Sequence, residues 1–189
     1  MCRISFKSCI MQEKSCPFGP AFRRERQQRG ISQWTVSMRL QYHTRNIQRI
    51  EDGSRQPGVL LALRMVVAVG ADPGDFFETL FEESVGEALD GAAVAPPQRL
   101  SVTYQPLGAV EGLKSIFGPL LAQARLAVGM SQTAMAKSAG YNLRNVNAVE
   151  KGQQEPGVMS ALALVVATGV NIREFFDQLH HASAALPKE

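Results

Sequence analysis

The sequence contains an internal repeat, and this repeat constrains the fold more than any other feature. When the sequence is aligned with itself at an offset of 99 residues, residues 18–80 match residues 117–179 without a gap, and 24 of the 63 aligned positions are identical. A repeat of this length indicates that one small structural unit occurs twice. We therefore predict two copies of one domain of about 65 residues, at residues 18–81 and 117–180.

The residues outside the two copies differ from them in composition. Residues 82–116 are rich in glycine, alanine and proline, which is typical of a linker. We predict that residues 1–17 and 181–189 are terminal tails. Within the linker, residues 82–89 are compatible with an extension of the last helix of the first copy. The alternation of apolar and polar residues at 100–104 is compatible with a short strand.

Each copy contains the signals of five short helices and no strand pattern. Ser32 and Ser131 are predicted N-caps of the second helix, because a serine hydroxyl accepts a hydrogen bond from an otherwise unpaired backbone N–H. A glycine ends the first, third and fourth helix, and a pair of phenylalanines lies in the fifth. The glycines are Gly30, Gly53, Gly70, Gly129, Gly152 and Gly169, and the phenylalanines are Phe76, Phe77, Phe175 and Phe176. These signals predict an all-α fold.

The composition, 45% hydrophobic and 20% charged with a net charge of +3, is typical of a globular protein. The longest apolar runs, near residues 59–69 and 161–170, are shorter than the ~20 residues that a membrane span needs. The N-terminus has no apolar leader, so we expect a cytoplasmic protein. No Ser/His/Asp set, paired carboxylates, metal-ligand spacing or phosphate-binding glycine loop is present. We therefore expect neither an enzyme nor a cofactor.

The three cysteines, Cys2, Cys9 and Cys16, lie in the first 16 residues at a spacing of seven. An odd number of cysteines does not suit a disulfide framework. On a helix they would share one face, which leaves a redox or metal-binding role open. No neighbouring histidine and no closely spaced cysteine pair supports that role, so the alternative is a frayed tail.

Two motifs recur at matching positions of the copies. A Gly-hydrophobic-Ser-Gln motif begins the second helix at residues 30–33 and 129–132, and the third helix leads into Ile50–Gly53 or Val149–Gly152. With the tight turn between these helices, both copies resemble the phage-repressor (Cro-like, xenobiotic-response-element) helix-turn-helix family, over about 125 residues. The resemblance implies two tandem five-helix, lambda-repressor-like domains. It also implies a DNA-binding transcriptional regulator, expected to be a repressor.

The resemblance further implies which side chains contact double-stranded DNA. In this family the third helix lies in the major groove, where Arg can read guanine and Asn or Gln can read adenine. The base-reading positions hold Thr44, Arg45, Asn46, Gln48 and Arg49 in the first copy and Leu143, Arg144, Asn145 and Asn147 in the second. The expected phosphate contacts are Gln33, Arg55, Gln132 and Lys151. The arginines of the first helix either also contact phosphate or form a solvated face.

The two copies are unequal in charge and in turn chemistry. Residues 18–58 carry 8 basic and 3 acidic side chains, a net of +5, whereas residues 117–157 carry 4 and 2, a net of +2. Because cations supply much of the affinity for DNA, we expect the first copy to bind more strongly. The second copy has Gly140 at a left-handed turn position where the first has Gln41, at a cost of about 1 kcal/mol. The dissimilar third helices predict an asymmetric operator with half-sites about 10 bp apart.

Other repeated residues are predicted to support the structure rather than to contact DNA. Arg26 with Glu51, and Arg125 with Glu150, match a family ion pair between the first helix and the end of the third. The phenylalanine pairs are expected in the core or at an interface. The fourth helices are apolar nearly all round and must be covered on more than one side. An intramolecular pseudo-dimer through the fourth and fifth helices, a homodimer, or burial within each bundle would each satisfy this requirement.

A second class of function also fits the sequence. The low charge of the second copy and its apolar fourth helix are compatible with a protein-interaction regulator, such as an antitoxin or antiactivator, that uses a helix-turn-helix copy to hold a partner protein.

Overall fold

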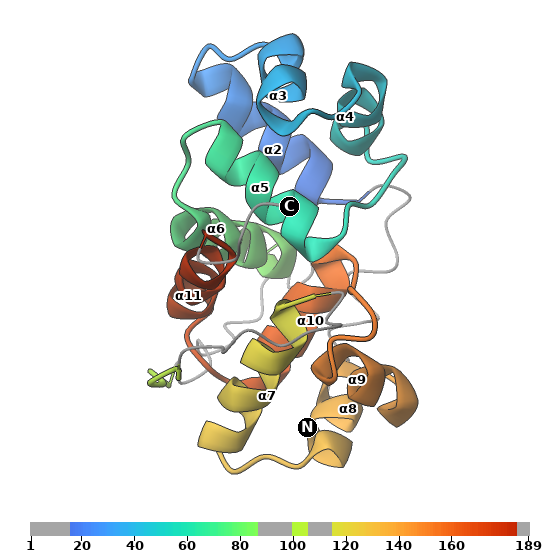
Figure 1. Cartoon of the computed structure of the whole chain (residues 1–189), viewed down its shortest axis with the longest axis vertical. Coiled ribbons are helices and arrows are strands. Elements are labelled where there is room, and N and C mark those ends of the chain that lie inside the picture. Colours follow the sequence, from blue (N-terminus) through green and yellow to red (C-terminus); the bar gives the residue numbers. More distant parts are fainter. Residues whose placement is uncertain (1–15, 87–99, 106–114, 185–189) are drawn as a thin grey trace.

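The computed structural model describes residues 16–86, 100–105 and 115–184 (Figure 1). Cys2 and Cys9 lie outside these ranges. The described residues form α-helices and no strand, which confirms the prediction of an all-α fold. The first unit, residues 16–86, and the second unit, residues 115–184, each contain five helices. The helices are α2 (Phe18–Gln28), α3 (Gln33–Leu40), α4 (Thr44–Glu51), α5 (Val59–Ala68), α6 (Pro73–Gly86), α7 (Phe117–Ala127), α8 (Gln132–Ala139), α9 (Leu143–Glu150), α10 (Val158–Thr168) and α11 (Ile172–Ala184).

Each helix of the first unit begins 99 residues before its counterpart in the second. The helix ends form as the sequence predicts. The Ser32 hydroxyl accepts a hydrogen bond from the N–H of Thr35 at 3.0 Å, and the Ser131 hydroxyl accepts one from Ala134 at 3.1 Å. Both serines are therefore N-caps. The six glycines predicted to end helices all have φ between +65° and +76°.

The last helix of each unit extends past the boundary predicted from the sequence. Helix α6 continues to Gly86, so residues 82–86 of the expected linker are helical, whereas 87–89 lie outside the described residues. Helix α11 continues to Ala184, four residues beyond the expected end of the second copy. At position 100 the structure has a single parallel bridge between Leu100 and Val170 instead of a strand. No ladder can form there, because α11 begins two residues after Val170.

Cys16 was expected in the N-terminal tail, yet it packs against the core beside α2. Its side chain is half-buried, and this burial raises the pKa of the thiol above its usual value. The residue thus belongs to the first unit.

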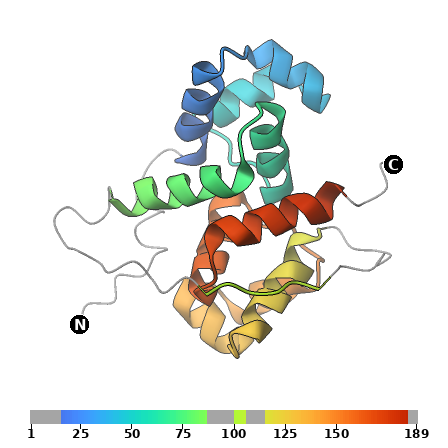
Figure 2. The same cartoon turned by 90° about the vertical axis from the view of Figure 1, so that its left-hand side faces the viewer.

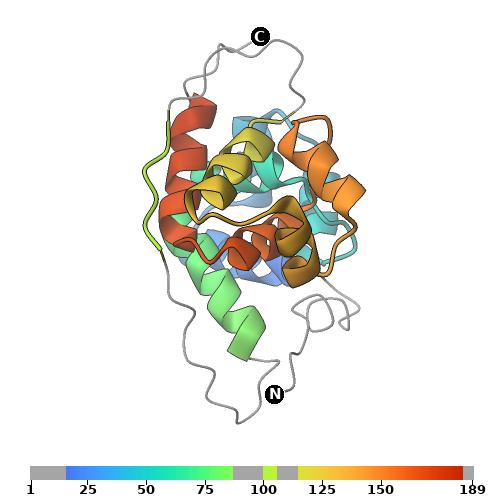
Figure 3. The same cartoon turned by 90° about the horizontal axis from the view of Figure 1, so that it is seen from below.

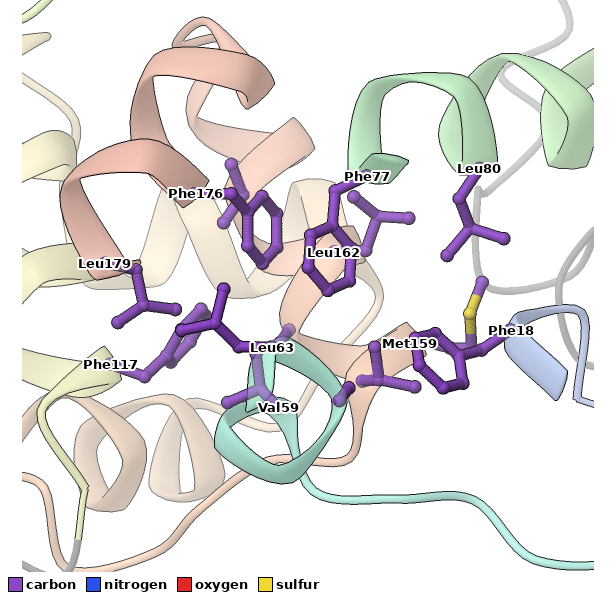
Figure 4. Close-up of a cluster of buried hydrophobic side chains, with 14 of the residues drawn as sticks. Phe18, Val59, Leu63, Phe77, Leu80, Phe117, Met159, Leu162, Phe176 and Leu179 are labelled. Carbon is purple, nitrogen blue, oxygen red and sulfur yellow. The ribbon is translucent and has the colours of Figure 1, made fainter. Parts of the chain in front are cut away.

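The two units contact one another through their fourth and fifth helices. Figures 2 and 3 both show α6 and α11 side by side, and α5 packs against α10. Figure 4 shows the buried cluster at this boundary, which contains Phe77 and Phe176 and draws side chains from both units. Of the three arrangements that the apolar fourth helices left open, the structure contains contacts between the two units of one chain, and the phenylalanine pairs lie where core and interface meet.

No helix among the described residues combines the length and the apolar character that crossing a membrane would require. Within the same ranges, no group of three His, Cys, Asp or Glu side chains is arranged to hold a metal ion.

Candidate nucleic-acid interface

The helix pair α3–α4 and its counterpart α8–α9 each turn through three residues. In the first unit the turn begins at Gln41, which has a φ of 51°, and in the second it begins at Gly140, which has a φ of 69°. The N–H of Tyr42 donates to the carbonyl of Ser37 at 3.0 Å, and that of Tyr141 donates to Ala136 at 2.8 Å. The backbone path is thus the same in both units, although only the second has the glycine that this conformation favours.

A buried ion pair fixes the end of α4 against α2. Arg26 Nε donates to Glu51 Oε1 at 2.6 Å and Nη2 donates to Oε2 at 2.9 Å. Arg26 Nη1 also donates to the carbonyl of Ile31 at 2.7 Å. Both side chains are buried, and the bidentate geometry satisfies the guanidinium and the carboxylate together. The predicted ion pair between the first helix and the end of the third is therefore present.

The second unit repeats the ion pair with nearly identical geometry. Arg125 Nε donates to Glu150 Oε1 at 2.6 Å, Nη2 donates to Oε2 at 3.0 Å, and Nη1 donates to the carbonyl of Met130 at 2.7 Å. In both units the first helix also lies very close to the end of the third. In the first unit, for example, a Cβ atom at Gly19 would collide with the carbonyl oxygen of Ile50. These contacts hold α4 and α9 in a fixed orientation.

Gln33 and Gln132, expected to contact phosphate, are held by the same carboxylates. Gln33 Nε2 donates to Glu51 Oε2 at 2.7 Å, and Gln132 Nε2 donates to Glu150 Oε2 at 2.6 Å. A glutamine amide nitrogen carries two N–H groups, so one remains to donate to a phosphate oxygen. Each glutamine therefore lies at the N-terminus of its helix with its side chain held in place.

The residues of α4 that are predicted to read bases lie mainly at the surface. Arg45, Gln48 and Arg49 are exposed, whereas Thr44 and Asn46 are half-buried. Arg55 Nη1 donates to Asn46 Oδ1 at 3.2 Å, which orients the amide of Asn46 and leaves its N–H₂ group as the donor. The buried face of α4 consists of Ile47, Ile50 and Glu51, so the helix is anchored on the side away from its arginines.

The residues of α9 that are predicted to read bases are similarly placed but chemically different. Arg144 and Asn145 are exposed and Asn147 is half-buried. Leu143 is 44% exposed, an apolar side chain at the start of the helix. The helix is capped by Asn142, whose Oδ1 accepts from the N–H of Arg144 at 2.8 Å. Lys151 is exposed directly after α9, as a phosphate contact would require.

Several arginines counted in the charge of the first unit have partners within the protein. Arg24 pairs with Glu83 at 2.5 Å and Arg29 pairs with Glu25 at 2.8 Å. Arg39 donates to the carbonyl of Ala68 at 2.5 Å. Arg45 and Arg49 form no ion pair with another described residue. The charges of Arg24 and Arg29 are therefore balanced within the protein, whereas Arg45 and Arg49 offer theirs at the surface of α4.

Helix α3 carries two exposed apolar side chains that were not predicted from the sequence. Trp34 is 65% exposed and Met38 is 61% exposed, although both are large and apolar. Their four-residue spacing places them on one face of the helix. The buried residues of α3 are Val36 and Leu40, which have the same four-residue spacing, so the sequence spacing did not show which of the two pairs faces the core.

The second unit has the fold and geometry of a helix-turn-helix domain, and comparison with known families agrees. Residues 121–175, from within α7 to the first turn of α11, match a family model described as helix-turn-helix. This part of the chain is therefore similar to a helix-turn-helix domain. No curated protein and no solved structure matches the chain.

Proposed function

We propose that this protein is a sequence-specific, double-stranded-DNA-binding transcriptional regulator with a helix-turn-helix domain in each unit. The observation that carries this proposal is the exposed surface of α4, which bears Arg45 and Arg49 on a helix that a buried ion pair holds in place. A rigid helix with exposed arginines suits the major groove, because the guanidinium can donate to guanine O6 and N7 together.

The remaining site residues fit this docking geometry. Gln33 and Gln132 lie at helix N-termini, where backbone N–H groups and the helix dipole favour a phosphate. The exposed Arg55 and Lys151 follow α4 and α9 and add positive charge beside the backbone of the duplex. Thr44, Asn46 and Gln48 in α4, and Leu143, Arg144, Asn145 and Asn147 in α9, are then the side chains that read bases. We expect repression, because a protein that occupies the groove blocks other proteins from the same site.

The test is a selection of random DNA duplexes by the full-length protein at roughly physiological salt, where non-specific binding is weak. We expect an enriched motif. The double variant Arg45→Ala, Arg49→Ala should bind that motif about tenfold or more weakly, since each bidentate contact contributes about 1–3 kcal/mol of discrimination.

The matched control is Arg24→Ala, which also removes a positive charge but from a side chain that pairs with Glu83 on α6. This variant should bind the motif as the unaltered protein does, apart from a small change in non-specific affinity. Specific binding that survives the loss of Arg45 and Arg49 would contradict the proposal.

A protein-interaction regulator is the second candidate, and the exposed Trp34, Met38 and Leu143 favour it. Exposed apolar side chains beside a helix-turn-helix are typical of a surface that holds another protein. If the selection enriches no duplex, this candidate becomes the leading one.

A further inference from the structure

We propose that a single copy of this chain occupies a whole DNA site, with its two units reading two half-sites of unequal sequence, and that chains do not pair with one another through α6 and α11. This inference rests on the proposed function. It follows from the contacts between the two units, some of which are symmetric and some of which are not.

The symmetric contacts relate the units by a local two-fold axis. The N–H of Val59 donates to the carbonyl of Pro156 at 3.1 Å, and the N–H of Val158 donates to the carbonyl of Pro57 at 2.9 Å. These residues are counterparts in the repeat, so each unit donates to the other the same hydrogen bond that it accepts from it. Such an exchange is the arrangement of an isologous dimer interface, here formed within one chain.

The asymmetric contacts lie at the starts of α6 and α11, where Gly74 and Arg173 are counterparts. Arg173 Nη1 pairs with Asp75 Oδ1 at 2.5 Å, and the N–H of Gly74 donates to Asp177 Oδ1 at 3.1 Å. A Cβ atom at Gly74 would lie 2.6 Å from Cγ of Arg173, too close for any side chain. The glycine of the first unit thus leaves room for the arginine that the second unit has at the same place.

A second asymmetric contact lies at the bridge between Gly58 and Gly157. Glu155 Oε1 accepts from the N–H of Leu60 at 2.9 Å and so caps the start of α5. At the other end of the bridge the counterpart of Glu155 is Gln56, which packs against Gly157. A carboxylate thus caps one helix start, where it stabilises the unpaired N–H groups, and a neutral amide lies at the other.

These contacts disfavour the pairing of like units. Two second units would place two Arg173 side chains beside each other, where the first unit offers Gly74 instead. Two first units would leave Asp75 without the arginine that neutralises it. The pairing of unlike units keeps these contacts and the pairing of like units loses them, and such a difference is how an interface discriminates among partners. These contacts therefore favour the pairing of a first unit with a second, and in the structure both units belong to the same chain.

This pairing places α4 and α9 in one molecule at defined positions. Figure 1 shows them at opposite ends of the long axis and both on the right-hand side, away from α6 and α11. Arg45 and Asn46 recur as Arg144 and Asn145, so the half-sites share the bases that these residues read. The other base-reading positions differ, because Thr44, Gln48 and Arg49 correspond to Leu143, Asn147 and Ala148. The site should therefore be an imperfect palindrome.

The first test is the stoichiometry of the complex. Full-length protein saturated with a duplex carrying the selected motif is weighed by native mass spectrometry. We expect one 20.6 kDa chain per duplex. Two chains per duplex would overturn this inference and leave the proposed function intact. Failure to bind any selected duplex would overturn the proposed function, and this inference with it.

The second test repeats the duplex selection with Arg45→Ala and with Arg144→Ala, each on its own, and with Arg24→Ala as the charge control. We expect each arginine variant to lose preference about tenfold or more in one half of the motif, and the two variants to affect different halves. The control should retain both halves. If each variant instead weakens both halves equally, two chains share the site, and the inference fails.

Discussion

Phe77 of α6 and Phe176 of α11 stack on each other with their ring centroids 3.9 Å apart and their planes 16° apart. The two residues are counterparts in the 99-residue repeat. A residue that contacts its own counterpart lies at the two-fold axis relating the units. Both rings are fully buried, so the stack joins the two units at the centre of the molecule.

We expect Phe77→Ala to reduce the free energy of unfolding by about 3–5 kcal/mol, because it removes a buried ring and leaves a cavity beside Phe176. The matched control is Trp34→Ala, which removes a larger ring that is 65% exposed and should change stability by about 0.5 kcal/mol or less. Urea unfolding measures both. Losses of similar size for the two variants would contradict the assigned burial.

Gln41 is the non-glycine residue with a positive φ among the described residues, at 51°. We expect Gln41→Gly to stabilise the protein by up to about 1 kcal/mol, since the left-handed conformation strains a residue with a Cβ atom. The reverse change in the second unit, Gly140→Gln, should destabilise it by about the same amount. Thermal unfolding of the two variants checks this, and changes of the same sign would refute it.

The ion pair of Arg26 and Glu51 is buried, so its loss should be costly. We expect Glu51→Ala to reduce the free energy of unfolding by about 3–5 kcal/mol, because it leaves the Arg26 guanidinium buried without a counter-charge. Glu25→Ala removes the exposed partner of Arg29 instead and should cost at most about 1 kcal/mol. Chemical denaturation compares them. A small effect of Glu51→Ala would show that water reaches Arg26.

Asp177 of α11 should make stability depend on pH. The pKa of Asp177 lies above its usual 3.8, because burial and, to a smaller extent, the negative charge of Asp72 raise it. The N–H of Gly74 and the charge of Arg173 lower this pKa, but by less. Because the folded-state pKa is the higher one, the contribution of Asp177 to stability is complete below the unfolded-state pKa. That contribution is lost as the pH rises through the folded-state value.

We therefore expect Asp177→Asn to raise the urea midpoint at pH 7, since asparagine keeps the acceptor for the Gly74 N–H and lacks the charge. The difference between the two proteins should shrink as the pH falls toward 4. A difference that does not vary with pH would contradict this explanation.

Much of the fold could be predicted from the repeat and from short-range signals. The glycines and serines that end and begin helices act within a few residues of themselves, so their roles at Ser32 or Gly129 follow from sequence alone. The ion pair of Arg125 and Glu150 was also predicted, but through the resemblance to a family, because 25 residues separate its partners.

The contacts that decide the assembly could not be predicted in this way. Two examples are the room that Gly74 leaves for Arg173 and the cap that Glu155 provides for α5. Both depend on how the two units approach each other, and the partners lie about a hundred residues apart in the chain. At the candidate site, the family resemblance predicted phosphate contacts for Gln33 and Gln132. It did not predict the hydrogen bonds of these residues to Glu51 and Glu150. Those bonds depend on tertiary geometry.

The exchanged hydrogen bonds at Val59 and Val158 also bear on how such a protein responds to its own abundance. A regulator that must first dimerise loses its active form on dilution, so occupancy of its site falls more steeply than total concentration. Here the pairing is unimolecular, and dilution does not undo it. Occupancy of a site by this chain would then follow simple hyperbolic saturation down to a few molecules per cell, without an assembly threshold.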